Sequence, residues 1–243
     1  LVGSEMCIRD RNTIVAEELT QFATELECCE SSNITEATIQ LIRRTLKEHK
    51  RILYSGNGYS EEWRQEALSR GLLEFKTAAD ALVHYTDPKN LELFKRHNIY
   101  SASELHAREN ILLMNYYQVI HIESKTMVYM LRKQILPAVF AYQAQLADIM
   151  QSKQAVGVSV AMEQKMMQKI NAPLETLDTL LEQLEEIIAK DVNEAKAAST
   201  FAATEILPLM ETIRQLTDTI ESNMPKKAWP MPDYNDILFQ SFD

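Results

Sequence analysis

The chain has 243 residues, of which 46% are hydrophobic, so it can bury a core and is not a disordered polymer. Its formal charge of −10 and pI near 5.1 exclude a basic groove for nucleic acid, because phosphate binding requires clustered Lys and Arg. Only 5 glycines and 7 prolines interrupt abundant helix-forming residues, so we expect an all-α protein.

Two helices are predicted in the first fifty residues. The first begins at Asn12, the expected cap, and its apolar residues recur at steps of three and four, at Val15, Leu19, Phe22, Leu26 and Cys29. The second follows Asn33, which has Glu36 three residues later as in a capping box. Its inward residues are expected to be Ile39, Ile42, Leu46 and Leu53.

Three further sequence signals for the start of a helix follow. Ser60 precedes two glutamates and predicts a short helix that ends at Gly71, a residue suited to a left-handed C-terminal cap. Asp87 and the proline after it predict a second helix, which stops at Asn98. Ser101, with a glutamate three residues later, is the third start signal. The region before Ser101 therefore consists of short helices.

From Ser101 the pattern changes to long helices. The first runs to about Gly157 and should kink near Pro137, which removes a backbone donor. The second contains Pro173, which can kink or restart it, and a coiled-coil-like seam at Leu174, Leu177, Leu181, Leu184 and Ile188. The third runs from 193 to 223 and is interrupted by Pro208. Three long amphipathic helices in sequence predict a long antiparallel bundle.

The last segment differs from the bundle. Three prolines between Pro225 and Pro232 exclude helix there, yet Trp229, Tyr234 and Phe239 are too apolar for a free tail. We therefore expect an extended arm that docks on protein surface. The predicted division is a non-native leader at 1–11, short helices at 12–100, the bundle at 101–224 and the arm at 225–243.

The pair Gly56-Asn57-Gly58 is the first candidate for a binding site, because glycine-rich loops can hold phosphate. A P-loop requires Gly-Lys-Ser/Thr, whereas Tyr59, Ser60 and Glu61 follow here. Two acids in the next helical turn would also repel a phosphate. We interpret the pair as a structural turn that uses the left-handed angles of Gly and Asn.

Other chemistry-bearing residues form no recognisable constellation. His121 and Glu123 point about 200° apart on a helix and cannot jointly bind one metal, and His106 with Glu109 is no better placed. The favoured reading is a buried, hydrogen-bonded His121 or Glu123, and their roles stay open. We therefore assign no catalytic, cofactor-binding or metal-binding residue.

The sulfur-containing residues are also read as structural. Cys7, Cys28 and Cys29 are odd in number and unpatterned, which argues against disulfides or zinc and fits a reducing cytoplasm. Cys28 and Cys29 lie at a helix end beside an acid, so we expect them to be inert. Methionines at helical spacing, Met162, Met166 and Met167, are expected to fill the core. No stretch of about 18 apolar residues is present to span a membrane.

Several stretches together resemble the C-terminal region of type III glutamine synthetases. They include GNGYSEEW, RGLLEFKTAADAL, IHIESKTM, RKQILPAV and WPMPDYNDILF. These stretches agree with the family in order and spacing from Asn12 to Phe239. The combination of GNGYSEEW with WPMPDYNDILF is the most specific.

The resemblance implies a part of a glutamate–ammonia ligase. The full enzyme would join glutamate and ammonia using ATP and Mg²⁺ in a cytoplasmic homo-oligomer, but none of the family's catalytic or metal residues maps onto this sequence. The helix from Asn12 resembles the one that closes the catalytic domain, and its apolar face should be exposed without that domain. Residues 1–11 match nothing in the family and suggest truncation before Asn12.

Two alternatives remain. A free-standing helical scaffold or partner-binding bundle would explain the absence of catalytic motifs and the seam from Leu174 to Ile188. A metal-binding helical bundle would require stoichiometric metal in the purified protein. The main hypothesis remains a fragment that contributes packing and subunit contacts and is inactive alone.

Overall fold

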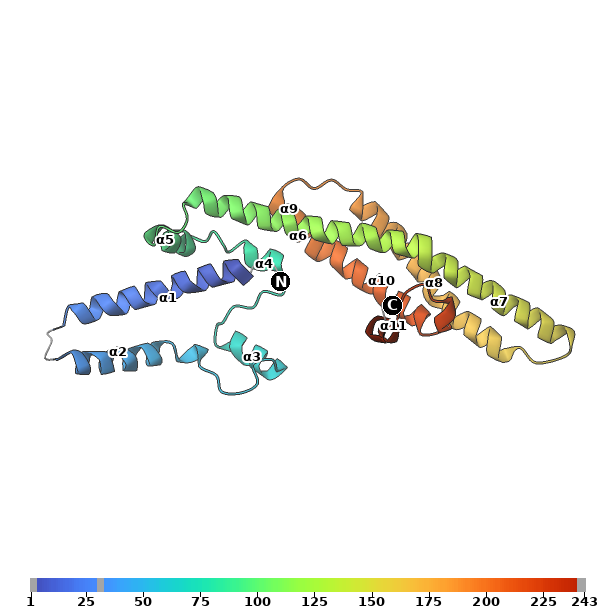
Figure 1. The fold of residues 1–243 in the computed structure, drawn as a ribbon, viewed down its shortest axis with the longest axis horizontal. Coiled ribbons are helices and arrows are strands. Elements are labelled where there is room, and N and C mark those ends of the chain that lie inside the picture. Colours follow the sequence, from blue (N-terminus) through green and yellow to red (C-terminus); the bar gives the residue numbers. More distant parts are fainter. Residues whose placement is uncertain (1–3, 30–32, 240–243) are drawn as a thin grey trace. The chain divides into compact units, whose positions relative to one another are not determined.

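The computed structural model describes residues 4–29 and 33–239, and within them it is all helical, as expected (Figure 1). The chain divides into two compact units, residues 1–110 and 111–243, and the point of division falls within one long helix. The predicted all-α class is confirmed. The finer division at residues 11, 100 and 224 stays a prediction.

The first unit consists of short elements after one longer helix. They are α1 (Ser4–Glu27), α2 (Ile34–Glu48), a 3₁₀ turn (Lys50–Ile52), α3 (Glu61–Ser69), α4 (Ala78–Leu82), α5 (Pro88–Arg96) and the beginning of α6 (Ala102–Met130). Gly71 has a φ of 73°, which confirms it as a left-handed helix end, and Asn98, where the next predicted helix stops, has a φ of 53°. The helix predicted to begin at Asn12 instead begins at Ser4, so Asn12 is not a cap.

The apolar face of α1 is exposed, as expected without the catalytic domain, whereas the side chains of α2 do not face as the sequence predicted. On α1 the buried residues are Thr13 and Glu17, whereas Val15 and Leu19 are 56% and 60% exposed. On α2 only Leu41 is buried. The apolar residues predicted to point inward lie outside, namely Ile39, Ile42, Leu46 and Leu53. Periodicity identifies an apolar stripe but not the surface that covers it.

The second unit is built from three long helical rods. The first joins the end of α6 through a π-helix, η3 (Leu131–Ile135), to α7 (Leu136–Ala155). The second is α8 (Ala161–Ile188). The third joins α9 (Ala195–Phe201) through another π-helix, η4 (Ala202–Ile206), to α10 (Leu207–Glu221). α8 runs antiparallel to the other two, as the predicted bundle requires (Figure 1).

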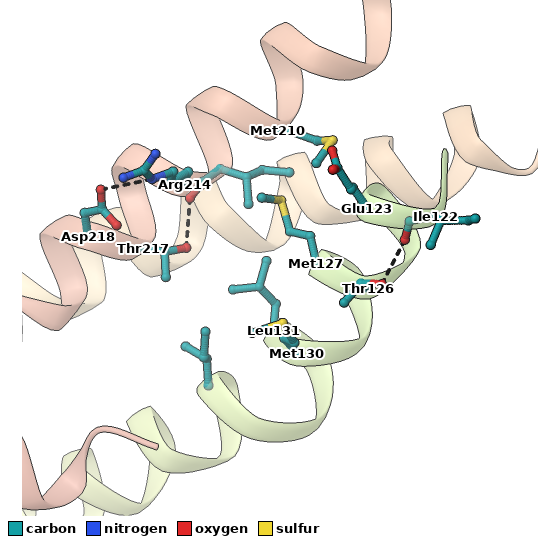
Figure 2. A pocket seen from close by; sticks show the side chains of 12 residues that line it. Ile122, Glu123, Thr126, Met127, Met130, Leu131, Met210, Arg214, Thr217 and Asp218 are labelled. Atoms are coloured by element: carbon teal, nitrogen blue, oxygen red, sulfur yellow. Dashed lines mark hydrogen bonds and ion pairs between the residues drawn. The ribbon is translucent and has the colours of Figure 1, made fainter. Parts of the chain in front are cut away.

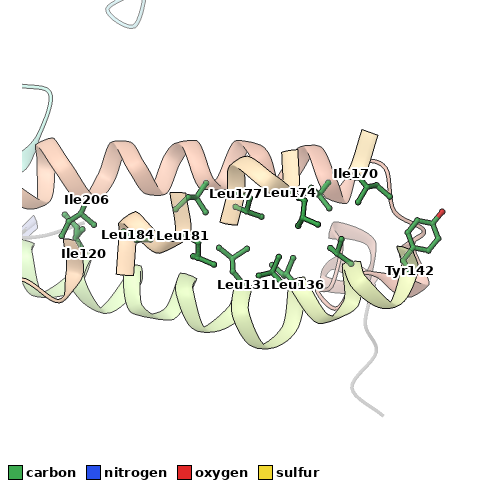
Figure 3. Close-up of a cluster of buried hydrophobic side chains, with 14 of the residues drawn as sticks. Ile120, Leu131, Leu136, Tyr142, Ile170, Leu174, Leu177, Leu181, Leu184 and Ile206 are labelled. Carbon is green, nitrogen blue, oxygen red and sulfur yellow. The ribbon is translucent and has the colours of Figure 1, made fainter. Parts of the chain in front are cut away.

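The predicted seam on α8 forms the centre of the core (Figure 3). Leu177, Leu181 and Leu184 have no exposed surface, and Leu174 is 8% exposed. Leu131, Val139 and Ile206 face them from the other rods. Burial of apolar surface is worth about 25 cal/mol per Å², so the closed packing of this seam stabilises the unit.

The three prolines of the rods have different surroundings. Pro137 and Pro208 each lie two residues after a π-helix, in the repeated sequence Ile-Leu-Pro. A π-helix widens the turn that a proline ring would otherwise crowd. Pro173 lies inside α8, which continues through it as α-helix. The expected disturbance at Pro137 therefore takes the form of a π-turn.

The final segment docks as expected but is not extended throughout. Pro225 and Trp229 have extended backbone angles, with a 3₁₀ turn (Lys226–Ala228) between them, and α11 (Tyr234–Phe239) follows. Trp229 packs against the core of the second unit. The prolines exclude α-helix only before Asp233. The Asp233 carboxylate accepts a hydrogen bond from the Asp236 amide at 2.8 Å and caps α11.

Candidate functional site: a groove between α6 and α10

The loop around Gly56 is a corner pinned by aromatic side chains. Tyr54 stacks on Trp63 with ring centroids 3.9 Å apart, and the Arg70 guanidinium lies over Trp63 at 5.3 Å. Ser60 Oγ accepts from the Trp63 amide at 3.3 Å and caps α3. A Cβ on Gly56 would lie 2.5 Å from the Tyr54 hydroxyl. The glycine is required for close packing, whereas the left-handed angles predicted for this turn are absent.

The structure does not bring His121 and Glu123 together. The Nδ1 atom of His121 is buried and has no hydrogen-bond partner among the described residues, and burial, followed by the charge of Lys125, lowers the pKa of its imidazole. Glu123 is exposed on another side of α6. Neither is therefore the buried, hydrogen-bonded group that the sequence suggested. His106 Nδ1 lies 3.6 Å from a Glu109 carboxylate oxygen.

Residues that could ligate a metal do not gather in the described part of the chain. No group of three or more His, Cys, Asp or Glu side chains there could hold an ion. Cys28 is exposed and Cys29 partly so, whereas the Cys7 side chain lies outside the described residues. Within those same limits, no helix is long and apolar enough to cross a membrane.

The methionines differ from one another in burial. Met167 packs against the core, as expected. Met166 is 37% exposed and accepts a hydrogen bond from the Tyr142 hydroxyl at 3.1 Å. Met162 is 80% exposed, so its expected role as core filler is wrong. It lies in the first turn of α8, where no other rod covers it.

A polar cluster joins α1 to α5 in the first unit. Glu17 is 9% exposed, accepts from Gln21 at 2.8 Å and lies 2.7 Å from the His97 imidazole. Arg96 also pairs with its carboxylate. Hydrogen bonds from Gln21 and then His97 hold the pKa of Glu17 below its usual range. Because Arg96 and His97 are about eighty residues from Glu17, sequence periodicity could not identify this cluster.

A groove lies between α6 and α10 in the second unit (Figure 2). Its volume is about 440 Å³. We call it the α6–α10 groove, and its lining residues are Ile122, Glu123, Thr126, Met127, Met130, Leu131, Ile135, Met210, Ile213, Arg214, Thr217 and Asp218.

The groove combines an apolar floor with a polar rim. Met127, Leu131 and Ile213 form part of the floor, and the carboxylates of Glu123 and Asp218 lie on the rim. The Arg214 side chain lies 3.6 Å from Asp218 along α10. A floor that contains methionines adapts to different apolar surfaces, and this combination is typical of grooves that accept an amphipathic helix. No group in it forms a nucleophile–base pair.

Comparison with known proteins supports the resemblance found in the sequence. The family model described as the glutamine synthetase C-terminal domain matches residues 37–154. The type-3 glutamine synthetase of Dictyostelium discoideum is 32% identical over 238 residues, which cover 94% of this chain and 32% of that protein.

Two bacterial relatives give the same result. The glutamine synthetase of Butyrivibrio fibrisolvens is 31% identical over 227 residues, covering 92% of this chain and 32% of the relative. That of Bacteroides fragilis is 26% identical, covering 94% and 33%. The chain thus spans about a third of the length of the curated relatives that it matches.

Residues 37–154 of this all-α chain match the glutamine synthetase C-terminal domain. Over nearly its whole length the chain is similar to the C-terminal part of glutamine synthetases, a type-3 enzyme among them.

Proposed function

We propose that this chain is the helical C-terminal part of an ATP-dependent, cytoplasmic glutamate–ammonia ligase. Its role is to support the catalytic part and to contribute subunit contacts in a homo-oligomer. Glutamate, ammonia, ATP and Mg²⁺ belong to the full-length protein, whose catalytic residues would lie in the two thirds that this chain does not span. Among the described residues, no group of three or more His, Cys, Asp or Glu side chains could hold the metal.

The exposed apolar stripe of α1 carries this proposal. Val15 and Leu19, four residues apart on one side of the helix, are 56% and 60% exposed. Contiguous apolar surface of this kind is uncommon on a complete soluble domain and is typical of an interface. A catalytic part that packs against α1 would cover it, as the resemblance of this helix to the closing helix of the catalytic domain implies.

The test compares the chain with its full-length form. The upstream gene sequence is recovered, both proteins are purified, and ATP-dependent glutamine formation is measured beside far-UV circular dichroism. We expect activity from the full-length protein and none from the chain, although the chain retains its helical spectrum. Activity of the chain alone would refute the proposal, as would a full-length protein without ligase activity.

A free-standing helical scaffold is the alternative, and the α6–α10 groove favours it because such a surface suits a partner helix. The same upstream sequence decides between the two. An in-frame extension that encodes a catalytic core excludes the scaffold, whereas a start codon next to this reading frame excludes the ligase.

A further inference from the structure

The outer side of α2 carries a second apolar surface that its own unit leaves uncovered. The helix packs on α1 through the side that contains Leu41, which is 5% exposed. Ile39, Ile42 and Leu46 are 38%, 52% and 53% exposed on a different side. Their spacing of three and four residues forms one line along the helix, which we call the α2 stripe.

The α2 stripe and the α6–α10 groove match in length. At 1.5 Å per residue, the stripe from Ile39 to Leu46 is about 10 Å long, and the α10 wall of the groove from Met210 to Asp218 is about 12 Å long. Three branched apolar side chains at this spacing are the usual anchors of a helix that binds in a groove. The apolar floor offers a surface of the same kind (Figure 2).

The charges at their edges are also complementary. Arg43 and Lys47 each follow a stripe residue directly and both are exposed, so the flank beside Ile42 and Leu46 is basic, with Glu36 on the same side one turn before Ile39. Glu123 and Asp218 give the groove an acidic residue on each wall, and Arg214 already lies near Asp218. Opposite charges at a rim favour one register of docking and exclude many others.

We propose that the α2 stripe of one copy of this chain docks in the α6–α10 groove of a second copy. The contact forms once in a head-to-tail pair, which leaves one stripe and one groove free for further copies, and twice in a two-fold dimer, which leaves none. Head-to-tail contacts close a ring when the rotation between copies permits it. The inference rests on the proposed role in subunit contacts and specifies the surfaces that make them.

Disulfide trapping between two differently tagged copies tests the contact directly. The native cysteines Cys7, Cys28 and Cys29 are first replaced by serine. One copy then carries Ile42→Cys and the other Met127→Cys, and the mixture is oxidised and separated on a non-reducing gel. We expect a cross-linked heterodimer in the mixture and none from either variant alone.

The matched control replaces Met127→Cys by Met162→Cys. Met162 is 80% exposed, whereas Met127 is partly buried, so random collision would favour the control. Equal cross-linking of the two pairs would overturn the proposal. Absence of the Met127 product from folded protein, as judged by circular dichroism, would overturn it as well.

Sedimentation velocity over a concentration series provides the second measurement. Ile42→Glu places a charge on the apolar floor, so we expect it to weaken self-association more than tenfold. Arg43→Glu, at the rim, should weaken it about two- to fivefold, and Glu123→Lys on the other copy should restore it. A wild-type chain that is monomeric at about 100 μM would refute the contact. None of these readouts requires ligase activity, so failure here leaves the proposed function standing.

Discussion

Gly56 and Gly58 lie two residues apart in one loop and differ in their surroundings. A Cβ on Gly56 would meet the hydroxyl and ring carbon of Tyr54 at 2.5 and 2.7 Å, whereas a Cβ on Gly58 would have nothing within 4 Å. Tyr54 cannot yield without disturbing its stack on Trp63. Only Gly56 is therefore tightly packed, although the sequence shows the two glycines as a pair.

Gly56→Ala is expected to lower the free energy of unfolding by about 1 kcal/mol, the worth of a disturbed aromatic pair. Gly58→Ala should cause no loss and a gain of up to about 0.5 kcal/mol, since it restricts only the unfolded chain. Urea unfolding followed by Trp63 fluorescence, with Trp229 replaced by Phe, measures both. Equal losses at the two positions would contradict the proposed role of Tyr54.

Glu17 links the docking of α1 and α5 to pH. Hydrogen bonds from Gln21 and His97 lower the pKa of its carboxylate in the folded state. A lowered folded-state pKa contributes stability above the ordinary glutamate value of about 4.3, and that contribution is lost as the pH falls through the folded-state value. The cluster therefore weakens on the acid side.

Glu17→Gln is expected to reduce this pH dependence. The urea midpoint of the wild type should fall more steeply than that of the variant as the pH drops from about 5 to 3. Near neutral pH the variant should be the less stable, because His97 and Arg96 lose their charged partner. Parallel profiles for the two proteins would show that the cluster does not contribute to stability. Glu18→Gln, on an exposed position of the same helix, is the control.

At the scale of the helix, the three rod prolines predict different responses to alanine. Pro173 interrupts the hydrogen bonding of a continuous α-helix, whereas Pro137 and Pro208 follow π-turns that accommodate their rings. Those two π-turns also set the register of buried residues such as Leu131 and Ile206. We therefore expect each π-turn to remain when Pro137 or Pro208 is replaced by alanine.

Pro173→Ala is expected to stabilise the second unit by about 1 to 3 kcal/mol, the usual cost of a proline within a helix. Pro137→Ala and Pro208→Ala should change the stability by less than about 0.5 kcal/mol, as exposed substitutions commonly do. Thermal unfolding followed at 222 nm measures all three. A similar gain from each proline would mean that the π-turns do not relieve the strain.

The elements predicted best from the sequence were those fixed by local signals. The α8 seam, the helix ends at Gly71 and Asn98, and the length of the long helices follow from spacing and caps. The orientation of α2 did not follow, because an apolar stripe does not reveal its partner. The α6–α10 groove was also missed, since Met127 and Met210 come from rods about eighty residues apart. The apolar residues Ile122 and Met130 on α6, which line the groove, were the sequence signal that could have indicated it.

On the scale of the whole molecule, the chain spans about a third of its relatives' length and leaves α1 with an uncovered apolar stripe. A substitution on that stripe therefore has different consequences in the chain and in the full-length protein. In the chain, Leu19 is 60% exposed and contributes little to folding. In the full-length protein, the proposed catalytic part buries it, which is worth about 1.5 to 3 kcal/mol for a leucine.

Leu19→Glu should leave the stability of the chain within about 0.5 kcal/mol of the wild type and increase its solubility, because the apolar patch becomes smaller. In the full-length protein the same change should lower the stability by about 2 kcal/mol or more, since a carboxylate would be buried at the interface. Val156→Glu, at a position that is 74% exposed between α7 and α8, should change neither protein. Urea midpoints of the four variants and of the two wild types measure the contrast. Equal effects of Leu19→Glu in the two proteins would mean that the catalytic part does not bury the apolar stripe of α1. The proposed packing of the catalytic part on this helix would then be wrong.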